Sequence, residues 1–547
     1  MTSTTGAQAL LQALRAMGVE AIFASPGSDW APLWEALASD GYWAERYVSS
    51  RHEETAMGMA LGYAKATGKL PAVVVHTTVG ALHTTMIARA ALHERIPIVI
   101  LAGEVIGFAE PPSPKVGRQW LRLLTDLGGP ARLMEACVKW SFALNVAHLL
   151  PQTIQRACQL ALTAPRGPVF VSVPTEYMLA GMAAKTAPAA LPALPQANEA
   201  ALGEIAAALD AAKHPVIVTE EAGRDPAAVG ALVALAEKLD APVFEAWQPT
   251  YHNFPADHRL YGGTIVDAVP PAFEQADTVL LVESVLPWHP PGSVTGKKVL
   301  ALGEDPLHTR LPYWGFRADV VAAGELVPAL AALEQRLKRR AGSASHRHAA
   351  PRVDQPRVID TAWVAQELNA AMPADAIVVN ETITHRLELH HRLDRLGPGR
   401  MFEASYGGLG VGLGLALGAK YAHKDRTVIC AIGDGAFHYN PVPGSFGAAQ
   451  EHGLPILVVL FDNAGYLSQK RDVSNYYPKG EAARRGRVIG TPIAPAPDYV
   501  KLAEAYGGNG EKVEKPGEVR AAIERGLKAV AQGKLVLLHM VLEPIDK

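Results

Sequence analysis

The chain has 547 residues, 49% of them hydrophobic and 19% charged, which is enough for about three domains with large cores. Its net charge of −3 gives no electrostatic support for binding nucleic acid or an anionic membrane. The longest apolar runs, such as 454–461, are too short to span a bilayer. Three scattered cysteines and an opening without the features of a signal peptide lead us to expect a cytoplasmic protein.

Helical and strand-like segments alternate along the chain, which predicts parallel sheets covered by helices. In the first block we expect helices at 6–17, 53–67 and 81–92, and strands at 21–23, 70–76, 96–101 and 168–173. In the second block we expect strands at 216–219, 243–246, 278–282 and 298–302. In the third block we expect strands at 376–380, 427–432, 455–461 and 535–541.

Two Ala- and Pro-rich stretches, 183–195 and 339–357, lack hydrophobic periodicity and are interpreted as linkers. They divide the chain into blocks at 1–182, 196–338 and 358–547. The sequence therefore predicts three consecutive α/β domains, each a doubly wound parallel sheet.

Two of the expected strands of the third block end in polar turns, Gly433-Asp434-Gly435 and Asp462-Asn463. Ligands bind α/β sheets at the carboxyl ends of neighbouring strands. There, Asp434 and Asn463 would offer oxygen ligands to Mg²⁺, with diphosphate oxygens completing the shell. Plain turns of an ordinary α/β protein are the alternative, but the pattern resembles the diphosphate-binding signature of thiamine diphosphate enzymes.

Glycines recur at 408, 410, 412 and 414, as they do in a dinucleotide-binding turn. That motif needs a clear strand before it and an acidic residue about twenty positions later, so we expect no nicotinamide site here. Leu409, a bulky residue between glycines, fits better as the side chain that holds thiamine diphosphate in a bent shape. The bend brings the reacting atoms together.

Glu53 begins a helix of small residues, where a carboxylate can simply stabilise the helix N-terminus. The functional interpretation is a partly buried carboxylic acid that shares a proton with N1′ of the aminopyrimidine of thiamine diphosphate. This promotes the imino tautomer, which removes the proton at C2 of the cofactor. Both interpretations place Glu53 at the start of the helix.

With three separated motifs in agreement, the whole chain resembles the thiamine diphosphate-dependent 2-keto acid decarboxylase/carboligase superfamily. The resemblance implies pyrimidine-binding, central and diphosphate-binding domains, with thiamine diphosphate and Mg²⁺ as cofactors. It makes Glu53 the activating carboxylate and assigns Asp434, Asn463 and the Gly465 carbonyl as metal ligands. It places at the cofactor Leu409, Gly407, Gly408, Gly435, Ala436, Thr382, Thr384 and Tyr466. It also implies a homodimer or homotetramer, because Glu53 and the diphosphate motif of one site come from different subunits.

Within the superfamily the chain is most similar to benzoylformate decarboxylases, with acetolactate synthase-like features. The turn 25–28 resembles the one that carries an active-site serine, which makes Ser28 the group that holds the substrate carboxylate. His76, after an expected strand, and His289, in the central block, resemble two catalytic histidines that move protons. The resemblance implies decarboxylation of a 2-keto acid, followed by release of an aldehyde or its ligation to a second carbonyl compound.

Several positions depart from that pattern. Asp462 stands where the family usually has asparagine, and Glu403, Ser468 and Gln469 are polar where benzoylformate decarboxylases have an aromatic pocket. The segment 470–497 is longer and carries Arg484, Arg485 and Arg487, so it is either a solvated loop or a mobile lid for an anionic substrate tail. The histidines at 385, 390 and 391 lack partners for zinc, and we expect them on a solvated helix face.

Three alternatives to a decarboxylase stay open. An acetolactate synthase-type carboligase is favoured by His52 next to Glu53 but opposed by His76, and enzymes of that type often carry FAD in the central domain. A non-catalytic protein that binds thiamine diphosphate would not need Glu53, Leu409, Asp434 and Asn463 all intact. An NAD oxidoreductase would bind nicotinamide and would not need Mg²⁺.

Overall fold

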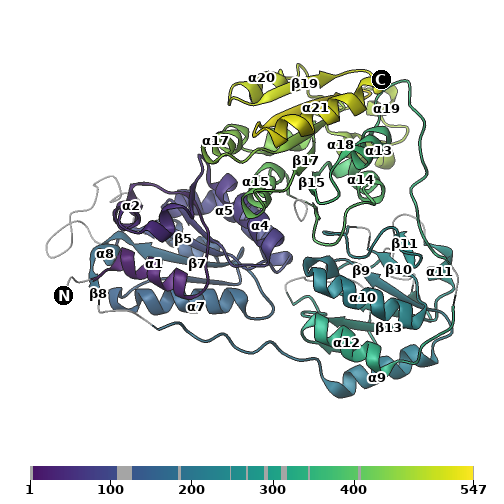
Figure 1. Cartoon of the computed structure of the whole chain (residues 1–547), viewed down its shortest axis with the longest axis horizontal. Coiled ribbons are helices and arrows are strands. Elements are labelled where there is room, and N and C mark those ends of the chain that lie inside the picture. The colour runs from purple at the N-terminus through teal and green to yellow at the C-terminus, as the bar shows by residue number, and fades with distance from the viewer. Residues whose placement is uncertain are drawn as a thin grey trace.

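The computed structural model describes residues 4–106, 126–182, 187–246, 248–265, 269–288, 294–309, 317–342, 345–403 and 408–545. Three sheets of six parallel strands, each covered by helices, follow one another along the chain. Figure 1 shows the N-terminal domain in purple and blue, the central domain in teal and the C-terminal domain in green and yellow. The expected fold class, three parallel α/β domains in series, is confirmed.

The N-terminal sheet has the order β3 (Tyr47–Ser49), β2 (Ile22–Ser25), β4 (Ala72–Val75), β5 (Val99–Glu104), β7 (Val169–Pro174) and β6 (Trp140–Ala143). Its helices are α1 (Gly6–Ala16), α2 (Ala31–Ala38), α3 (Gly41–Ala44), α4 (Glu53–Thr67), α5 (Thr77–His93), α6 (Pro130–Met134), α7 (Leu150–Leu162) and α8 (Thr175–Leu179). A small antiparallel pair, β1 (Thr4–Thr5) with β8 (Gly181–Met182), joins the two ends of this domain.

The central sheet has the order β11 (Tyr261–Thr264), β10 (Val243–Glu245), β9 (Pro215–Thr219), β12 (Thr278–Val282), β13 (Lys298–Gly303) and β14 (Val320–Ala323). Its helices are α9 (Glu199–Ala211), α10 (Pro226–Leu239), α11 (Pro271–Glu274) and α12 (Leu326–Arg336). The strand order reverses between β9 and β12, which is the point where sheets of this kind bind nucleotides.

The C-terminal sheet has the order β16 (Met401–Glu403), β15 (Ile377–Glu381), β17 (Val428–Gly433), β18 (Leu457–Asp462), β20 (Val536–Val541) and β19 (Asn509–Val513). Its helices are α13 (Thr361–Ala371), α14 (Arg386–Arg392), α15 (Gly412–Ala422), α16 (Asp434–Tyr439), α17 (Val442–His452), α18 (Leu467–Tyr476), α19 (Glu481–Arg485), α20 (Tyr499–Glu504) and α21 (Val519–Ala531).

All twelve strands expected from the sequence are present, with bounds that shift by a few residues. The expected helix 53–67 coincides with α4, whereas α5 begins four positions earlier than the expected 81. No strand or helix lies within 187–195 or within the described part of 339–357, as expected for linkers. The domain boundaries at 182, 196, 338 and 358 stay predictions.

The N-terminal and C-terminal domains share one hydrophobic core, in which α4 packs against α15 between the two sheets (Figure 1). The helix backbones touch through glycines. A Cβ atom on Gly62 would lie 2.0 Å from the carbonyl oxygen of Leu415, and one on Gly418 would lie 2.0 Å from that of Met59. Glycine is required at these positions because any side chain would push the two helices apart.

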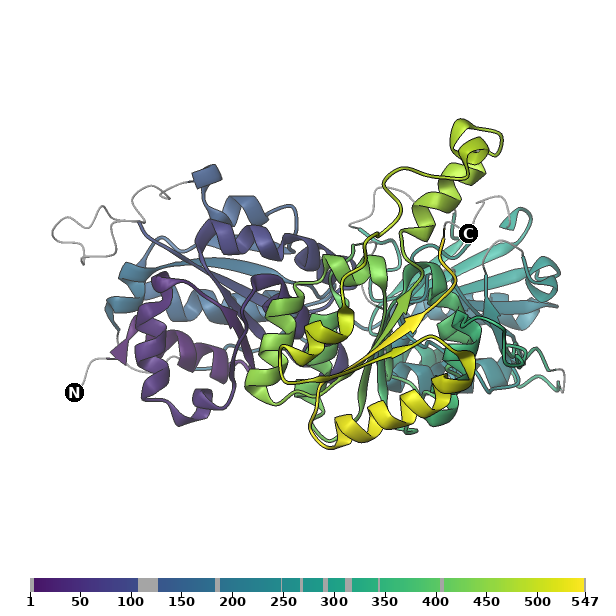
Figure 2. The same cartoon turned by 90° about the horizontal axis from the view of Figure 1, so that it is seen from above.

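The segment 470–497 contains most of α18 and all of α19, and residues 486–497 after them are irregular. No residue of α18 or α19 is buried, and Figure 2 shows this yellow-green hairpin projecting from the body of the molecule. Arg484 and Arg485 both pair with Glu481 of the same short helix. We call residues 467–490 the arm.

Candidate active site

A cavity opens at the carboxyl edge of the C-terminal sheet, where β15, β17 and β18 end side by side. Its described lining residues all belong to the C-terminal domain, between 381 and 469. Nine predicted site residues line it: Thr382, Thr384, Leu409, Asp434, Gly435, Ala436, Asn463, Gly465 and Tyr466. The structure therefore brings together most of the residues assigned to the diphosphate and the metal. Gly408 packs against Met86 of α5, and Gly407 lies outside the described residues.

Asp434 lines this cavity, and both of its carboxylate oxygens accept hydrogen bonds from backbone amides. Oδ1 accepts a hydrogen bond from the Gly435 amide and Oδ2 accepts one from the Gly465 amide, both at 2.8 Å. The Asn463 side-chain oxygen also accepts from the Gly465 amide, at 3.2 Å. Burial, and then the negative charge of Asp462, raise the pKa of Asp434 to about 7. The carboxylates of Asp434 and Asp462 thus place negative charge next to the backbone and side-chain amide oxygens of this cavity.

Asp462, the departure from the family pattern, is bonded to a histidine and lies next to Asp434. His539 Nε2 lies 2.6 Å from Asp462 Oδ2, and the Ala464 amide donates to Oδ1 at 2.8 Å. Burial raises the pKa of Asp462, but the hydrogen bonds from His539 and the Ala464 amide outweigh it and leave the pKa below its usual value. Asp462 therefore carries the negative charge that the neighbouring Asp434 feels.

Glu381, which the sequence analysis did not single out, organises the glycine-rich turn. Its buried carboxylate accepts hydrogen bonds from the amides of Gly410, Val411 and Gly412 at 2.9–3.0 Å, and from the Asn440 side chain at 2.9 Å. These amides are the donors that a dinucleotide phosphate would need. The turn is therefore already occupied by a side chain of the protein, and it places Leu409 on the cavity wall.

Ser28 and His76 meet at the carboxyl edge of the N-terminal sheet, after the neighbouring strands β2 and β4. Asp29 Oδ1 lies 2.7 Å from His76 Nδ1, and the Trp30 indole donates to the Val75 carbonyl at 2.8 Å. Position 27 must be glycine, because a Cβ atom there would lie 2.2 Å from His76 Nδ1. The buried Asp29 was missed in the sequence, although it directly follows Ser28; it fixes the orientation of the His76 ring.

Glu53 lies at the first position of α4, after β3, which neighbours β2. Its helix is capped by His52, whose Nδ1 accepts from the Glu54 amide at 3.2 Å. Thr55 and Ser445 of α17 share a hydrogen bond at 3.2 Å. Glu53, Ser28 and His76 thus share one sheet edge, whereas Asp434 and Asn463 share another, in a different domain of the chain.

Four further predicted positions have different outcomes. Ser468 and Gln469 line the cavity at the base of the arm. Glu403 is instead buried at the junction of the central and C-terminal domains, where Asn380 donates to it at 3.1 Å. His289 lies outside the described residues.

The expectation of a solvated face for the histidines of α14 is wrong for His390. This side chain is 1% exposed, and its Nε2 lies 2.6 Å from Glu245 Oε2 of the central sheet. Burial alone would lower the pKa of His390, but the Glu245 and Glu403 carboxylates raise it to about 9. The apolar spacing of α14 is poor, so nothing in the sequence indicates that a charge pair would bury this histidine.

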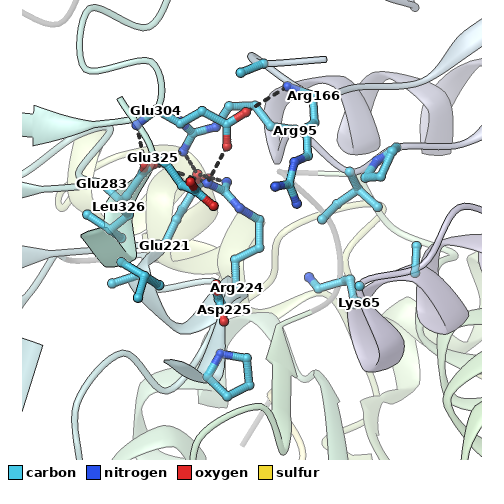
Figure 3. Close-up of a pocket in the computed structure, with 18 of the residues that line it drawn as sticks. Lys65, Arg95, Arg166, Glu221, Arg224, Asp225, Glu283, Glu304, Glu325 and Leu326 are labelled. Atoms are coloured by element: carbon cyan, nitrogen blue, oxygen red, sulfur yellow. Dashed lines mark hydrogen bonds and ion pairs between the residues drawn. The ribbon is translucent and has the colours of Figure 1, made fainter. Parts of the chain in front are cut away.

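Where the strand order of the central sheet reverses, Figure 3 shows a pocket lined by charged side chains of both signs, among them Arg95, Arg224 and Glu221. Arg95 of the N-terminal domain inserts there and pairs with Glu221, after β9, and Glu283, after β12. Glu220 accepts from the amides of Val285 and Leu286 at 2.8 and 2.9 Å. The walls of this pocket therefore carry cations as well as carboxylates, and Arg95 and Arg224 are paired with Glu221 and Glu283.

The fold and these two sheet edges define a three-domain α/β protein with a polar cavity at the carboxyl edge of its C-terminal sheet. Domain models described as thiamine pyrophosphate enzyme N-terminal TPP binding, central, and C-terminal TPP binding domains match residues 4–111, 202–310 and 384–540. The chain belongs to the thiamine pyrophosphate enzyme family.

Its relatives include both enzyme types named by the resemblance. It is 26% identical to acetolactate synthase isozyme 2 large subunit of Escherichia coli, over 99% of this chain and 96% of that protein. It is 27% identical to benzoylformate decarboxylase of Pseudomonas aeruginosa, over 97% and 98%. The solved structure of a thiamine diphosphate-dependent 4-hydroxybenzoylformate decarboxylase from Rhodococcus jostii is similar, with a TM-score of 0.86, 25% identity and all of both chains covered.

The residues present fit thiamine diphosphate and Mg²⁺. Asp434, Asn463 and the Gly465 carbonyl are an oxygen-only donor set, which suits Mg²⁺, and the negative charge shared by Asp434 and Asp462 calls for a cation. Leu409 lines the same cavity. In the described part of the chain, no helix is long and apolar enough to cross a membrane.

Proposed function

We propose that this protein decarboxylates a 2-keto acid without oxidation, using thiamine diphosphate and Mg²⁺, and that it can also ligate the product to an aldehyde acceptor. When bound, thiamine diphosphate supplies the electron sink that loss of CO₂ requires. The observation that carries the proposal is the pairing of His76 with the buried Asp29 beside Ser28, on the sheet edge that also bears Glu53.

Each of these side chains has a defined task in the proposal. Glu53 shares its proton with N1′ of the aminopyrimidine. Ser28 positions the substrate carboxylate. His76, held by Asp29 through Nδ1, moves a proton to and from the reacting carbon or oxygen through Nε2. Asp434, Asn463 and Gly465 hold Mg²⁺, and the remaining cavity residues contact the diphosphate.

The acetolactate synthase-type carboligase is the second candidate, supported by the relatives of that name. One observation favours the decarboxylase. The His76–Asp29 pair provides a proton donor that the alternative does not need. The polar Ser468 and Gln469 at the cavity make benzoylformate itself a poor match as substrate.

The proposed enzyme is a homodimer or a dimer of dimers. Its support is that the described wall of the cofactor cavity comes from the C-terminal domain alone, so Glu53 would arrive from a second copy. In addition, α5, next to Glu53, exposes Val79 and Leu82 to 41% and 44%. An apolar face of this kind is covered when two subunits associate.

The test is a CO₂-release and aldehyde-trapping assay with thiamine diphosphate and Mg²⁺, using pyruvate, benzoylformate, phenylpyruvate and branched 2-keto acids. We expect cofactor-dependent aldehyde from one of them. We expect Glu53→Gln to lose this activity while still binding the cofactor, and the neighbouring Glu54→Gln to keep most of it. A hydroxyketone as the sole product would move the assignment to the carboligase, and full activity of Glu53→Gln would refute the mechanism.

A further inference from the structure

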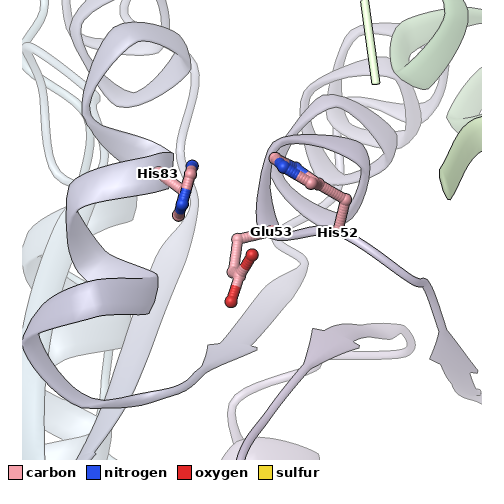
Figure 4. A group of neighbouring side chains, drawn as sticks. All are labelled: His52, Glu53 and His83. Carbon is pink, nitrogen blue, oxygen red and sulfur yellow. The ribbon is translucent and has the colours of Figure 1, made fainter. Parts of the chain in front are cut away.

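Among the described residues, a group of three metal-ligating side chains lies outside the magnesium site. One ligand atom each of His52, Glu53 and His83 lies within 4.8 Å of the other two. Figure 4 shows the Glu53 carboxylate between the two imidazoles, with His52 and Glu53 at the start of α4 and His83 on α5. We infer that these three side chains form a binding site for a transition-metal ion such as Zn²⁺ or Co²⁺.

The geometry requires only a small adjustment to close around an ion. The imidazole rings of His52 and His83 are 5.0 Å apart between centroids and nearly perpendicular. Zinc bonds to nitrogen and oxygen are about 2.0–2.2 Å long, so the ligand atoms must approach to about 3.5 Å. His83 is exposed and can rotate towards the other two side chains. Two histidines and one carboxylate leave further coordination positions open to water.

The donor set separates this site from the one at Asp434. Imidazole nitrogens prefer Zn²⁺, Co²⁺ and Ni²⁺, whereas carboxylate and carbonyl oxygens suit Mg²⁺. Excess Mg²⁺ therefore fills the site at Asp434 and leaves the His52–Glu53–His83 site available. The chain would hold two cation sites of different chemistry on its two sheet edges.

Metal binding competes with the cap of α4. His52 Nδ1 accepts the hydrogen bond from the Glu54 amide. A metal ion on Nδ1 displaces this bond directly, and one on Nε2 leaves the proton on Nδ1, which can then no longer accept. Occupation of the site is therefore coupled to loosening of the first turn of α4, which carries Glu53.

One consequence rests on the proposed function. The metal ion and the aminopyrimidine of the cofactor would claim the same Glu53 carboxylate, so binding of the two would be mutually exclusive. A transition metal would then inhibit by occupying the carboxylate, while the magnesium ligands stay untouched.

The experiment is a Co²⁺ titration of the untagged full-length chain, freed of metal by a chelator and supplied with excess Mg²⁺. Nitrogen-ligated Co²⁺ has a visible absorption band that Mg²⁺ lacks, and this band is the readout. We expect His83→Ala to weaken Co²⁺ binding at least tenfold, and His148→Ala, which alters an exposed histidine of another element, to leave it unchanged. Added Zn²⁺ should displace the Co²⁺.

Equal Co²⁺ affinity of His83→Ala and the unmodified chain would overturn the site. Since His83 is exposed, an unchanged melting temperature will confirm that this variant folds. Thiamine diphosphate is then added to the unmodified chain, and we expect the apparent Co²⁺ affinity to fall. If Co²⁺ binds through His83 but ignores the cofactor, the metal site stands and the role of Glu53 in the proposed function is refuted.

Discussion

His390→Gln removes one member of a buried ion pair that joins the C-terminal domain to the central sheet. The pKa of His390 rises from 6.5 to about 9 because the Glu245 carboxylate lies 2.6 Å from Nε2. That difference corresponds to about 3 kcal/mol of stability. Because the pKa is raised in the folded protein, this stabilisation is fully present below pH 6.5 and is lost as the pH rises through 9.

The assay is urea unfolding followed by tryptophan fluorescence at pH 6 and pH 9.5, using the free energy of the first cooperative transition. We expect the unmodified chain to lose about 3 kcal/mol more than His390→Gln between these two values. The matched control is His391→Gln. Burial and the charge of His390 lower the pKa of His391 to about 3, so His391 is neutral in the folded protein at both pH values. Its titration in the unfolded chain changes the stability at pH 6 by less than about 1 kcal/mol, so the control should still lose stability as the pH rises.

The free energy of the His390–Glu245 pair is not counted a second time when the pKa of Glu245 is considered. Burial raises the pKa of Glu245, but the charge of His390 outweighs it and lowers the pKa to about 2. We expect His390→Gln to destabilise the protein by about 3–5 kcal/mol at pH 6, because it leaves Glu245 buried without its partner. An equal fall in stability between pH 6 and 9.5 with and without His390 would refute this reasoning.

Three other changes test the site and the core. Asp29→Asn removes the carboxylate that orients His76, and we expect kcat to fall by about 10²-fold with a small change in KM, measured by CO₂ release; an unchanged kcat would exclude His76 as the proton donor. Chelation of Mg²⁺ should abolish turnover and Mg²⁺ should restore it, whereas Asp434→Ala should not recover at the same concentration; recovery would remove Asp434 from the ligand set. Gly62→Ala places a methyl group 2.0 Å from a carbonyl oxygen of α15, so we expect a loss of about 1–3 kcal/mol in urea unfolding; no loss would show that the two helices separate freely.

The sequence predicted the inner strands of each sheet and missed the outer ones. All twelve expected strands are found. The six missed strands of the three parallel sheets, β3, β6, β11, β14, β16 and β19, are their edge strands, and the short pair β1 and β8 was missed as well. An inner parallel strand is buried on both faces and forms a continuous apolar run. Edge strands such as β6 and β19 are mostly half-buried or exposed, so their composition does not distinguish them from loops.

The candidate site shows the same division between local and distant information. Asp434 and Asn463 were predictable because each follows an apolar run directly, and nine of the assigned residues line one cavity. Glu381 and Asp29 were missed because their importance comes from partners far along the chain: the amides of residues 410–412, and His76, 47 positions away. A single sequence gives no signal for such contacts.

The contact between α4 and α15 constrains how this chain can change over evolutionary time. At Gly62 and Gly418 the atom that a new side chain would strike is a backbone carbonyl oxygen of the opposite helix. Every amino acid has that oxygen, so no second substitution on the facing helix can make room. A mutation at either glycine therefore has no compensating partner at the point of contact, and selection can only restore the glycine itself.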